Sequence, residues 1–555
     1  FTNSSPIENR AEETPEYRLP VDVAFPDNYN LELTLEENVF DINKFSGILK
    51  LTFKILKETQ EIKLHANDKL QFSEVKLTGK DGKEIANINY AVNSQTEILT
   101  ITTDTILSTG DYILNFIYTG DLRTDGMYGF YKSYYLDSEG QYNYLATTQF
   151  QATYARRAFP CFDEPLFKAT FDIKIRHQEK FNALGNTKGE RRLDADKPGF
   201  VVTTFGQTPK MSTYLVAFIV SDFDCSLDDS SVPHQICSRV EAASTRKLAL
   251  ELGPQILTAL EDYTGVPYAD EQITKIDQVA IPDFSAGAME NWGLATYRET
   301  ALLWDEQKSS NRYKQRIATV ITHELAHMWF GDLVTTHWWD DTFLNEGWAT
   351  YLEYFITAKV LNDWQLEKQF VLDELQPMLQ IDSLQSSRPL SFKASTPAEV
   401  SSRFTSVSYN KGGSILRMVE NFMGTENFKK GITKYLKDNS YNNVVPSDLW
   451  TAFQEFTADL PETLEKVMEK WVIKSGYPLL TVRVNGSNVI ISQERFFTDG
   501  GVPSDSEKWY VPVTWTKSND PNTFQNRWLL PSEDLVIQGE LTDATEWIIL
   551  NKQQI

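Results

Sequence analysis

Two histidines and a glutamate in the middle of the chain have the residue types and spacing of a metal site. His323 and His327 lie four residues apart within residues 317–330, a segment whose pattern predicts a helix ending at Gly331. That spacing puts both imidazoles on one helix face, one turn apart, where they can bind one cation. Glu324 lies about 100° round the helix, beside the cation rather than under it. This is the geometry of a base that acts on a metal-bound water.

The third ligand separates the alternatives, because a bare H-E-x-x-H could also be two surface histidines and a salt bridge. A metzincin would need glycine at 330 and histidine at 333; this chain has Phe330 and Leu333, so that class is excluded. Glu346, separated from His327 by 18 residues, lies in a segment that we expect to be a second amphipathic helix. Glu346 would complete a His2Glu site with its fourth position open, the layout of catalytic zinc. The chain has six histidines, and no other two stand at metal-binding spacing.

Two residues near these ligands receive other interpretations. We expect His337 to be a surface or loop residue. Glu353 lies two turns after Glu346 on the same helix face, where it could hydrogen-bond a metal ligand. We favour an exposed glutamate over that alternative.

At these residues the chain resembles the aminopeptidase N family of gluzincin exopeptidases, and three further segments strengthen the resemblance. They are Gly287-Ala288-Met289-Glu290-Asn291, similar to the family's exopeptidase signature; Ser408-Tyr409-Asn410-Lys411-Gly412, similar to the segment with its transition-state tyrosine; and Thr148-Gln149-Phe150-Gln151 with residues 155–165, similar to its substrate-facing loop. The resemblance covers the whole chain. It is strongest to the membrane alanyl aminopeptidase branch of animals, among which we favour the invertebrate gut members.

The resemblance implies a zinc metallo-exopeptidase that removes neutral N-terminal residues, such as alanine, leucine or methionine, by attack of a zinc-bound water. One zinc per chain would be held by His323, His327 and Glu346, with Glu324 as the base. An enzyme that counts one residue from a free amine needs carboxylates and amide oxygens fixed at a set distance from its metal.

The resemblance assigns the remaining contacts to residues of the three further segments. Glu290, with Gln151 and Glu346, would bind the free amine, although some relatives have glutamate where Gln151 stands. Tyr409 would donate a hydrogen bond to the oxyanion that forms at the scissile carbonyl. Gln149 and Ala288 would contact the substrate, and Met289 would line an apolar pocket for the first side chain.

The elements that must position these residues follow in the order β, mainly α, β. Alternating apolar residues predict strands from Pro20 to about Phe223, for example at Tyr29, Leu31, Leu33 and Leu35 and at Leu49, Leu51, Phe53 and Ile55. From Ala243 to Lys474 the pattern predicts that long amphipathic helices dominate. After Gly476 a hairpin is expected, with strands at residues 480–484 and 489–492 and a turn at Asn485-Gly486.

The predicted fold is therefore multidomain α+β. Together with the resemblance, the pattern indicates an N-terminal β-rich saddle domain over 1–223, a thermolysin-like, mainly helical catalytic domain over 224–475, and a small β-sandwich over 476–555. Relatives carry a large helical domain after the sandwich. That domain is absent from this chain, which ends at Ile555 and which we therefore expect to be truncated or cleaved at this point.

Composition and charge limit the partners. The net charge of −24 argues against nucleic-acid binding, which needs a basic stripe, and indicates a solvated acidic surface. The longest apolar run, residues 214–220, is too short to cross a bilayer. Because the chain begins with Phe1, we expect a mature form whose targeting segment is not shown, and any membrane contact would be made through an anchor outside this chain. A homodimer is a further expectation.

Cysteines and sequons bear on the compartment. Cys225 and Cys237 end apolar runs on either side of a polar turn, which fits a disulfide across a hairpin or two buried thiols equally well. N-x-S sequons at Asn3 and Asn485 fit a glycosylated chain. We expect a location at the extracellular face of the plasma membrane or secretion.

Two other function classes are compatible with the same scaffold. An epoxide hydrolase of the leukotriene type shares the scaffold, but it has a different glycine-rich motif in place of Gly287-Ala288-Met289-Glu290-Asn291. A catalytically silent or moonlighting cell-surface receptor is the other class. Silent relatives usually lack a zinc ligand or the base, and this chain has all four residues.

Overall fold

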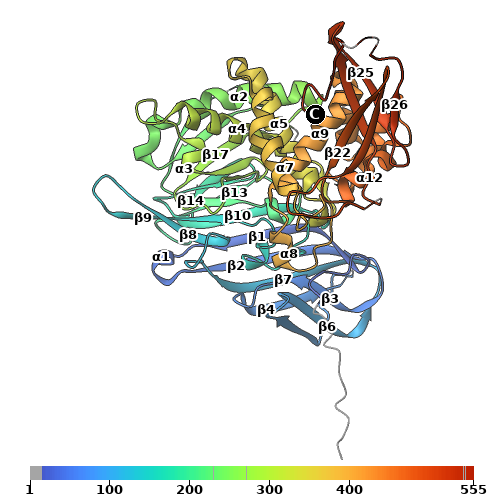
Figure 1. The fold of residues 1–555 in the computed structure, drawn as a ribbon. Coiled ribbons are helices and arrows are strands. Elements are labelled where there is room, and N and C mark those ends of the chain that lie inside the picture. The colour runs from blue at the N-terminus through green and yellow to red at the C-terminus, as the bar shows by residue number, and fades with distance from the viewer. Residues whose placement is uncertain are drawn as a thin grey trace, which may run out of the picture.

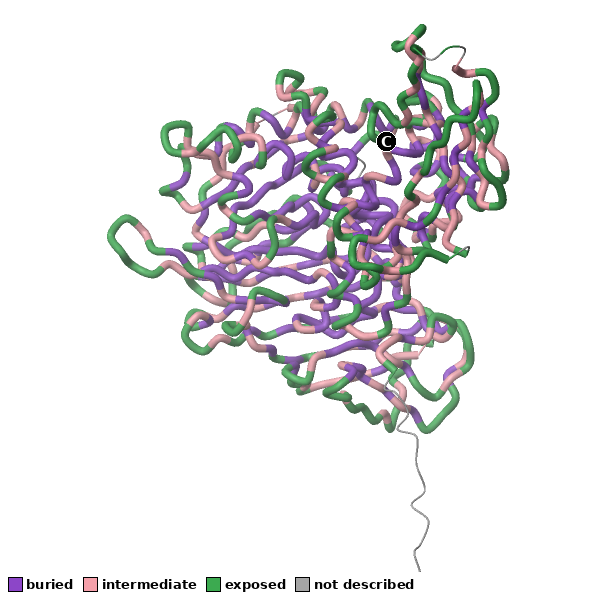
Figure 2. Tube along the Cα trace, viewed as in Figure 1, coloured by how far each residue is buried: buried purple, intermediate pink, exposed green. Residues whose placement is uncertain are grey.

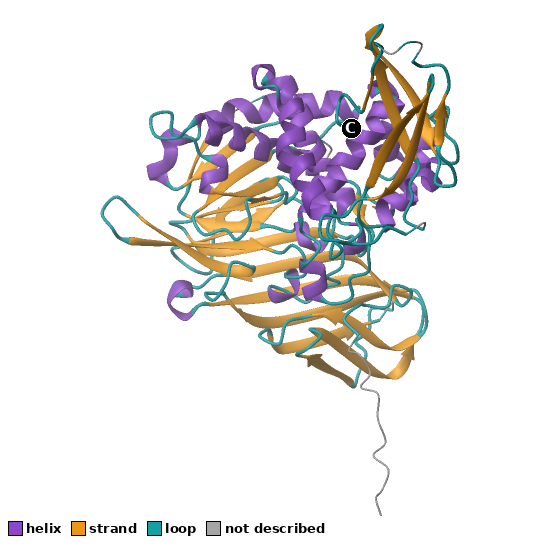
Figure 3. Cartoon of the chain, in the orientation of Figure 1, coloured by secondary structure: helices purple, strands orange, loops and turns teal. Residues whose placement is uncertain are grey.

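The computed structural model describes residues 16–79, 81–228, 230–269, 272–504, 506–541, 543 and 545–555. Figure 1 shows the strands of the N-terminal half below a layer of helices, with a small pair of sheets packed beside the helices at the C-terminal end. Strands and helices are segregated in the same way in Figure 3. Figure 2 shows the most continuous burial along the strands and helices where these layers meet.

The N-terminal half is built of strands, as its alternating pattern predicts, and its described residues form three sheets. The largest has seven strands in the order β12 (Gly189–Leu193), β13 (Phe200–Phe205), β10 (Thr170–Gln178), β1 (Ala24–Thr34), β2 (Lys44–Ile55), β7 (Gly110–Asp121) and β4 (Gln71–Thr78). A four-stranded sheet has the order β11 (Asn182–Gly185), β14 (Phe218–Ser221), β9 (Tyr142–Gln149) and β8 (Gly129–Leu136). The third is β3 (Thr59–His65), β6 (Ile98–Leu107) and β5 (Ile88–Asn93).

The alternation in the first two strands is confirmed. The predicted apolar residues of β1 and β2 are buried, whereas their neighbours are largely more accessible, so one face of this sheet packs into the core. The register pairs Leu31 with Leu49 and Tyr29 with Leu51, which places these side chains on the same face. Only a small helix, α1 (Val39–Ile42), separates β1 from β2.

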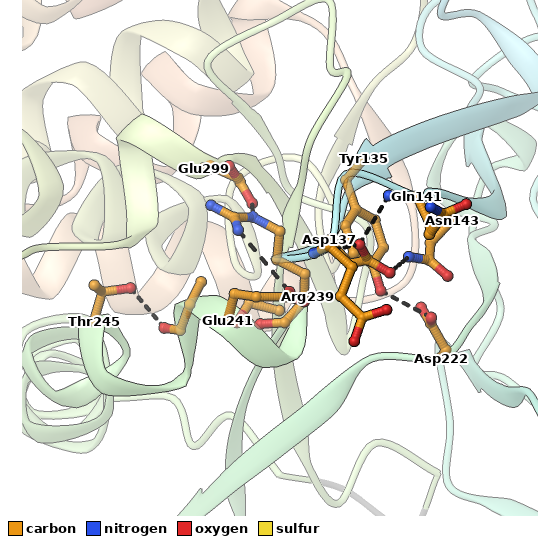
Figure 4. Close-up of polar contacts among 12 residues, drawn as sticks. Tyr135, Asp137, Gln141, Asn143, Asp222, Arg239, Glu241, Thr245 and Glu299 are labelled. Atoms are coloured by element: carbon orange, nitrogen blue, oxygen red, sulfur yellow. Dashed lines mark hydrogen bonds and ion pairs between the residues drawn. The ribbon is translucent and has the colours of Figure 1, made fainter.

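The β8–β9 hairpin joins the N-terminal sheets to the middle of the chain. Asp137 closes its tip by accepting hydrogen bonds from the Gln141 amide at 2.9 Å and from Asn143 Nδ2 at 3.1 Å. Nearer the core, the Tyr135 hydroxyl donates to Asp222 Oδ2 at 2.8 Å (Figure 4). These contacts fix the strand that ends at Gln149, a residue of the expected substrate-facing loop.

The middle of the chain is mainly helical, but a five-stranded sheet precedes most of the helices. Its order is β15 (Asp224–Asp228), β16 (His234–Ser238), β17 (Ile276–Ile281), β19 (Leu294–Arg298) and β18 (Ala288–Met289). The prediction that helices dominate 243–474 is confirmed, but it did not indicate the strands within residues 276–298. Every residue of β17 is buried, so its sequence lacks the alternation that marks a strand with one solvated face.

The helices of the middle region pack against this sheet and, farther along the chain, against one another. They are α2 (Lys247–Thr264), α3 (Glu299–Leu302), α4 (Asn311–His327), α5 (Phe343–Val360), α6 (Leu366–Phe370), α7 (Gln376–Asp382), α8 (Pro397–Ser401), α9 (Gly412–Met423), α10 (Thr425–Asp438), α11 (Pro446–Gln454) and α12 (Leu464–Ile473). Two π-helical turns, η6 (Val371–Leu375) and η7 (Val407–Lys411), lie among them. A short pair, β20 (Thr335–Thr336) and β21 (Asn443–Val444), ties the loop after α4 to the end of α10.

The C-terminal region forms two three-stranded sheets. One is β22 (Pro478–Asn485), β23 (Asn488–Arg495) and β26 (Leu535–Ile537); the other is β25 (Asp520–Leu529), β24 (Val511–Lys517) and β27 (Ile548–Leu550). The predicted hairpin is confirmed, with Asn485 paired to Asn488, but its turn is Gly486-Ser487, one residue later than expected. The expected boundaries at 223/224 and 475/476 fall between β14 and β15 and between α12 and β22.

Three local features concern the compartment. Cys225 and Cys237 are directly opposite in the β15–β16 pair and form a disulfide, so the alternative of two buried thiols is wrong. Asn485 is exposed at the end of β22, whereas Asn3 lies outside the described residues. Over the residues that the structure describes, no helix is both long and apolar enough to span a bilayer.

Candidate active site

His323, His327 and Glu346 converge on one point between α4 and α5. The Nε2 atoms of the histidines are 3.1 Å apart, and Glu346 Oε2 is 3.4 Å from that of His323 and 3.2 Å from that of His327. A tetrahedral site with ligand bonds of about 2.0–2.1 Å has edges of about 3.3–3.4 Å. The three donor atoms therefore fit a tetrahedral zinc ion, and they are the only metal-ligand cluster found among the described residues.

The outer nitrogen of each histidine is fixed by a second contact. His327 Nδ1 lies 2.9 Å from the carbonyl oxygen of Phe330. A carbonyl only accepts, so Nδ1 carries the proton and Nε2 keeps its lone pair for a cation. The contact forms because α4 ends at His327, three residues before the predicted helix pattern ends, and the chain then turns back.

Glu353 holds the other imidazole, which corrects the expectation of an exposed glutamate. Its side chain is only 9% exposed, and its Oε2 accepts from His323 Nδ1 at 3.1 Å. Helix α5 is also not amphipathic over this stretch, because residues 343–354 are buried at every position. The helix lies between α4 and other helices, so the face that carries Glu353 packs against α4 instead of facing solvent.

Close helix packing brings Tyr409 to the same point. A Cβ added to Gly347 would come within 2.9 Å of Gly412 Cα, so only glycines allow α5 and the start of α9 to approach this closely. Gly347 follows the ligand Glu346, and Gly412 follows the π-helical turn that carries Tyr409. The Tyr409 ring consequently stacks on His323, with centroids 6.0 Å apart and planes 11° from parallel.

A buried ion pair anchors the Tyr409 turn from behind. Lys411 Nζ lies 2.8 Å from Asp382 Oδ2, with both side chains at most 2% exposed, and it donates to the Gly476 carbonyl at 3.2 Å. Asp382 Oδ1 in turn accepts from the Gly476 amide at 2.8 Å. The turn is thus tied to the segment between α12 and β22 by groups that are costly to leave unpaired.

Opposing effects set the charges of the converging groups. Burial lowers the pKa of His323, but hydrogen bonds to Glu346 and Glu353 outweigh burial and raise it to about 9. Burial raises the pKa of Glu346, but His327 and His323 outweigh it and lower it to about 2. The His327 pKa is likewise raised, by Glu290 and Glu346 against burial. A cation that binds here replaces the imidazole protons, so its uptake releases them.

Glu324 lies beside these groups in a cavity of about 690 Å³. Its side chain is buried, and burial raises its pKa to about 8, against the lowering effect of His323 and His327. A pKa near neutrality suits a group that must both accept and return a proton.

The loop residues expected to contact substrate occupy one wall of this cavity. Glu290 is 3% exposed, and Gln151 Nε2 donates to its Oε1 at 3.0 Å. Gln149 and Ala288 also line the cavity. Met289 does not; it is fully buried behind the wall, where its sulfur accepts a hydrogen bond from Gln149 Nε2 at 3.4 Å. Met289 therefore shapes the wall through Gln149 rather than by forming it.

Comparison with known proteins assigns the family. Residues 25–215 match the peptidase M1 N-terminal domain, and residues 248–471 match the peptidase family M1 domain. The chain belongs to peptidase family M1. The resemblance to the aminopeptidase N family is thereby confirmed, as is the mixed α+β fold with a β-rich N-terminal part.

Several curated M1 relatives are similar over nearly the whole chain. They include membrane alanyl aminopeptidase of Manduca sexta (36% identity over 97% of this chain), aminopeptidase N of Homo sapiens (38% over 96%) and puromycin-sensitive aminopeptidase of Caenorhabditis elegans (35% over 96%). The chain spans 57% of the length of the first two and 56% of the third. These identities are so close to one another that they do not show which N-terminal residue this chain would prefer in a substrate.

Within this M1 site, the structure adds residues that the sequence did not indicate. Arg316 and Glu374 line the cavity. Arg316 lies seven residues before His323 and so on the same face of α4, a spacing that could have been noticed. Glu374 comes from η6, and no local pattern links it to the metal ligands. His337 is half-buried and lies in the loop after β20, as predicted for a surface or loop residue.

Proposed function

We propose that this chain is a zinc metallo-exopeptidase that removes neutral N-terminal residues, of the alanine, leucine and methionine kind, from peptides. The observation that carries the proposal is a His2Glu centre in a cavity of about 690 Å³ whose wall also presents the buried carboxylates Glu324 and Glu290. Membership of family M1 and the aminopeptidase names of its relatives support it.

One zinc ion per chain would be held by His323, His327 and Glu346. Zinc bound there supplies a Lewis acid that polarises a carbonyl and lowers the pKa of water. Glu324 takes a proton from the attacking water and passes it to the leaving amine. The Tyr409 hydroxyl donates a hydrogen bond to the oxyanion as the carbonyl becomes tetrahedral. One such donor stabilises the transition state by about 2.7–4 kcal/mol.

The free amine sets the position of cleavage. Glu290, oriented by Gln151, accepts hydrogen bonds from the ammonium group, and Glu346 adds negative charge on the other side. Gln149 and Ala288 contact the first residue, with Met289 behind Gln149. The buried Gln149 Oε1 has no hydrogen-bond partner among the described residues, so it is free to accept one from a ligand.

Acetylation of the N-terminus tests this arrangement. A peptide and its acetylated twin are compared by kcat/KM in wild type and in Glu290→Ala, with and without a chelator. We expect wild type to discriminate against the acetylated peptide by about 10⁴ or more, because buried polar groups would be left unpaired. Glu290→Ala should raise KM and shrink that gap. Comparable cleavage of both peptides by wild type would overturn the proposal in favour of an endopeptidase.

Location, assembly and domain division are further proposals. The Cys225–Cys237 disulfide and the exposed sequon at Asn485 support an extracytoplasmic location, at the outer face of the plasma membrane or secreted. Peptides with a free N-terminus are the proposed partners, and a homodimer stays a prediction. We also propose domains at 1–223, 224–475 and 476–555. A silent receptor is not favoured, because His323, Glu324, His327 and Glu346 are all present.

A further inference from the structure

The cavity around the metal site carries more negative charge than the proposed chemistry uses. Five glutamates line it, together with one arginine, Arg316. Glu346 is a metal ligand, Glu324 the base and Glu290 the amine-binding group. Glu353 bonds His323 and lies 3.7 Å from Arg316 Nη1, so it also has partners. Only Glu374 has no part in the proposed reaction.

Among the described residues, Glu374 has one hydrogen-bond donor and no ion-pair partner. The Tyr354 hydroxyl donates to its Oε1 at 2.6 Å. Across the residues that the structure describes, no lysine, arginine or histidine nitrogen lies within 4.0 Å of its carboxylate. The side chain is half-buried, and burial is the main cause that raises its pKa, to about 7. A partly desolvated carboxylate of this kind gains more from an incoming cation than an exposed one does.

Glu374 and Glu290 line the cavity from different elements. Glu290 directly follows β18, which packs against α4, whereas Glu374 lies in η6, which packs against η7, the turn that carries Tyr409. A peptide whose amine meets Glu290 and whose first carbonyl lies at the metal site would therefore extend from the β18 side of the cavity toward Glu374.

The cation must be carried to Glu374 by a side chain of the peptide, because the amine itself is bound at Glu290. Lysine and arginine carry a positive charge at the end of a long, flexible stem.

We propose that Glu374 forms a subsite for a cationic side chain, lysine or arginine, on the residue directly after the scissile bond. The inference rests on the proposed function and adds a substrate class to it: peptides with a neutral first residue and a basic second residue. The lysine ammonium or arginine guanidinium donates to the Glu374 carboxylate and supplies an ion-pair partner that none of the described residues provides. Arg316, whose side chain is 60% exposed, stays paired with Glu353.

The test uses two tripeptide amides that differ only at the second residue, lysine or its uncharged analogue norleucine, with alanine first. For the 555-residue chain we expect kcat/KM for the lysine peptide to exceed that for the norleucine peptide by about fivefold to tenfold, the effect of one partly screened charge pair. Glu374→Gln should bring this ratio to within about twofold of one. Asp373→Asn is the matched control, because it removes an exposed charge next in sequence that does not line the cavity; it should keep the ratio.

Each outcome is decisive. A lysine preference that survives in Glu374→Gln, or that disappears equally in Asp373→Asn, overturns the subsite. Equal hydrolysis of both peptides by wild type overturns the subsite and leaves the proposed function intact. Failure of wild type to hydrolyse either peptide, with zinc present, overturns the proposed function and the inference with it.

Discussion

Glu353 offers the sharpest test of how the metal site is built, because the sequence did not indicate its role. Its Oε2 accepts from His323 Nδ1 at 3.1 Å, with the two side chains 9% and 12% exposed. Glu353→Ala removes both the acceptor and its charge. Glu353→Gln keeps an acceptor for Nδ1 and removes the charge alone.

The expected magnitude comes from two opposing effects. Loss of a partner that orients a ligating histidine lowers metal affinity by about 10-fold to 100-fold, or about 1.4–2.7 kcal/mol. Glu353 also helps to raise the pKa of His323 to about 9, after Glu346 and against burial. Below that pH, zinc must displace a proton, and removing Glu353 makes the displacement easier. The loss of affinity should therefore approach its full value near pH 9 and be smaller near pH 7.

Competition with a chromophoric zinc chelator at pH 7 and pH 9 measures both effects. We expect the zinc affinity to fall most in Glu353→Ala and by about tenfold in Glu353→Gln at pH 9. Both losses of affinity should be smaller at pH 7. Glu367→Gln, an exposed glutamate on α6, is the control and should bind zinc as wild type does. Zinc affinity within twofold of wild type at pH 9 in Glu353→Ala would refute the reasoning, as would a loss that is the same at both pH values.

Three further predictions concern the base, the oxyanion donor and acid stability. Glu324→Gln should abolish peptide hydrolysis while metal analysis still finds about one zinc per chain; loss of the zinc would mean that Glu324 is a ligand. Tyr409→Phe should lower kcat by about 10²–10³ with little change in KM, and an unchanged kcat would remove Tyr409 from the mechanism. Burial lowers the pKa of His234 to about 4, so the unfolded chain, with a pKa of about 6.5, binds this proton more tightly. The stability that neutral His234 contributes is therefore complete above pH 6.5 and is lost as pH falls toward 4, by about 2 kcal/mol between pH 7 and pH 5. The free energy of unfolding, measured with urea, should depend less on pH between 5 and 7 in His234→Asn than in wild type. An unchanged pH dependence would contradict the role given to His234.

The sequence alone determined the parts of the site that local geometry dictates. Four residues make about one helical turn, so His323 and His327 had to share a face of α4 wherever that helix lay. The sequence also determined the strands β1 and β2, through their alternation, and the hairpin signalled by Asn485-Gly486. Each of these signals depends only on neighbours in sequence. Family motifs extended this knowledge to Glu290 and Tyr409.

Tertiary packing decided the rest. Residues 343–354 of α5 carry no separate apolar and polar faces, so their pattern does not show which face is buried. The position of α5 between other helices makes Glu353 a partner of His323 instead of a surface charge. The burial of β17 on both faces hid it from a search for alternation. The register of β15 against β16, which sequence does not state, set Cys225 opposite Cys237 and so decided between a disulfide and two thiols. Glu374 reaches the cavity from a π-helical turn, held by Tyr354 of α5. In each case the outcome depends on which distant segment lies across from a residue, and that is fixed by the fold as a whole rather than by the residues beside it in the chain.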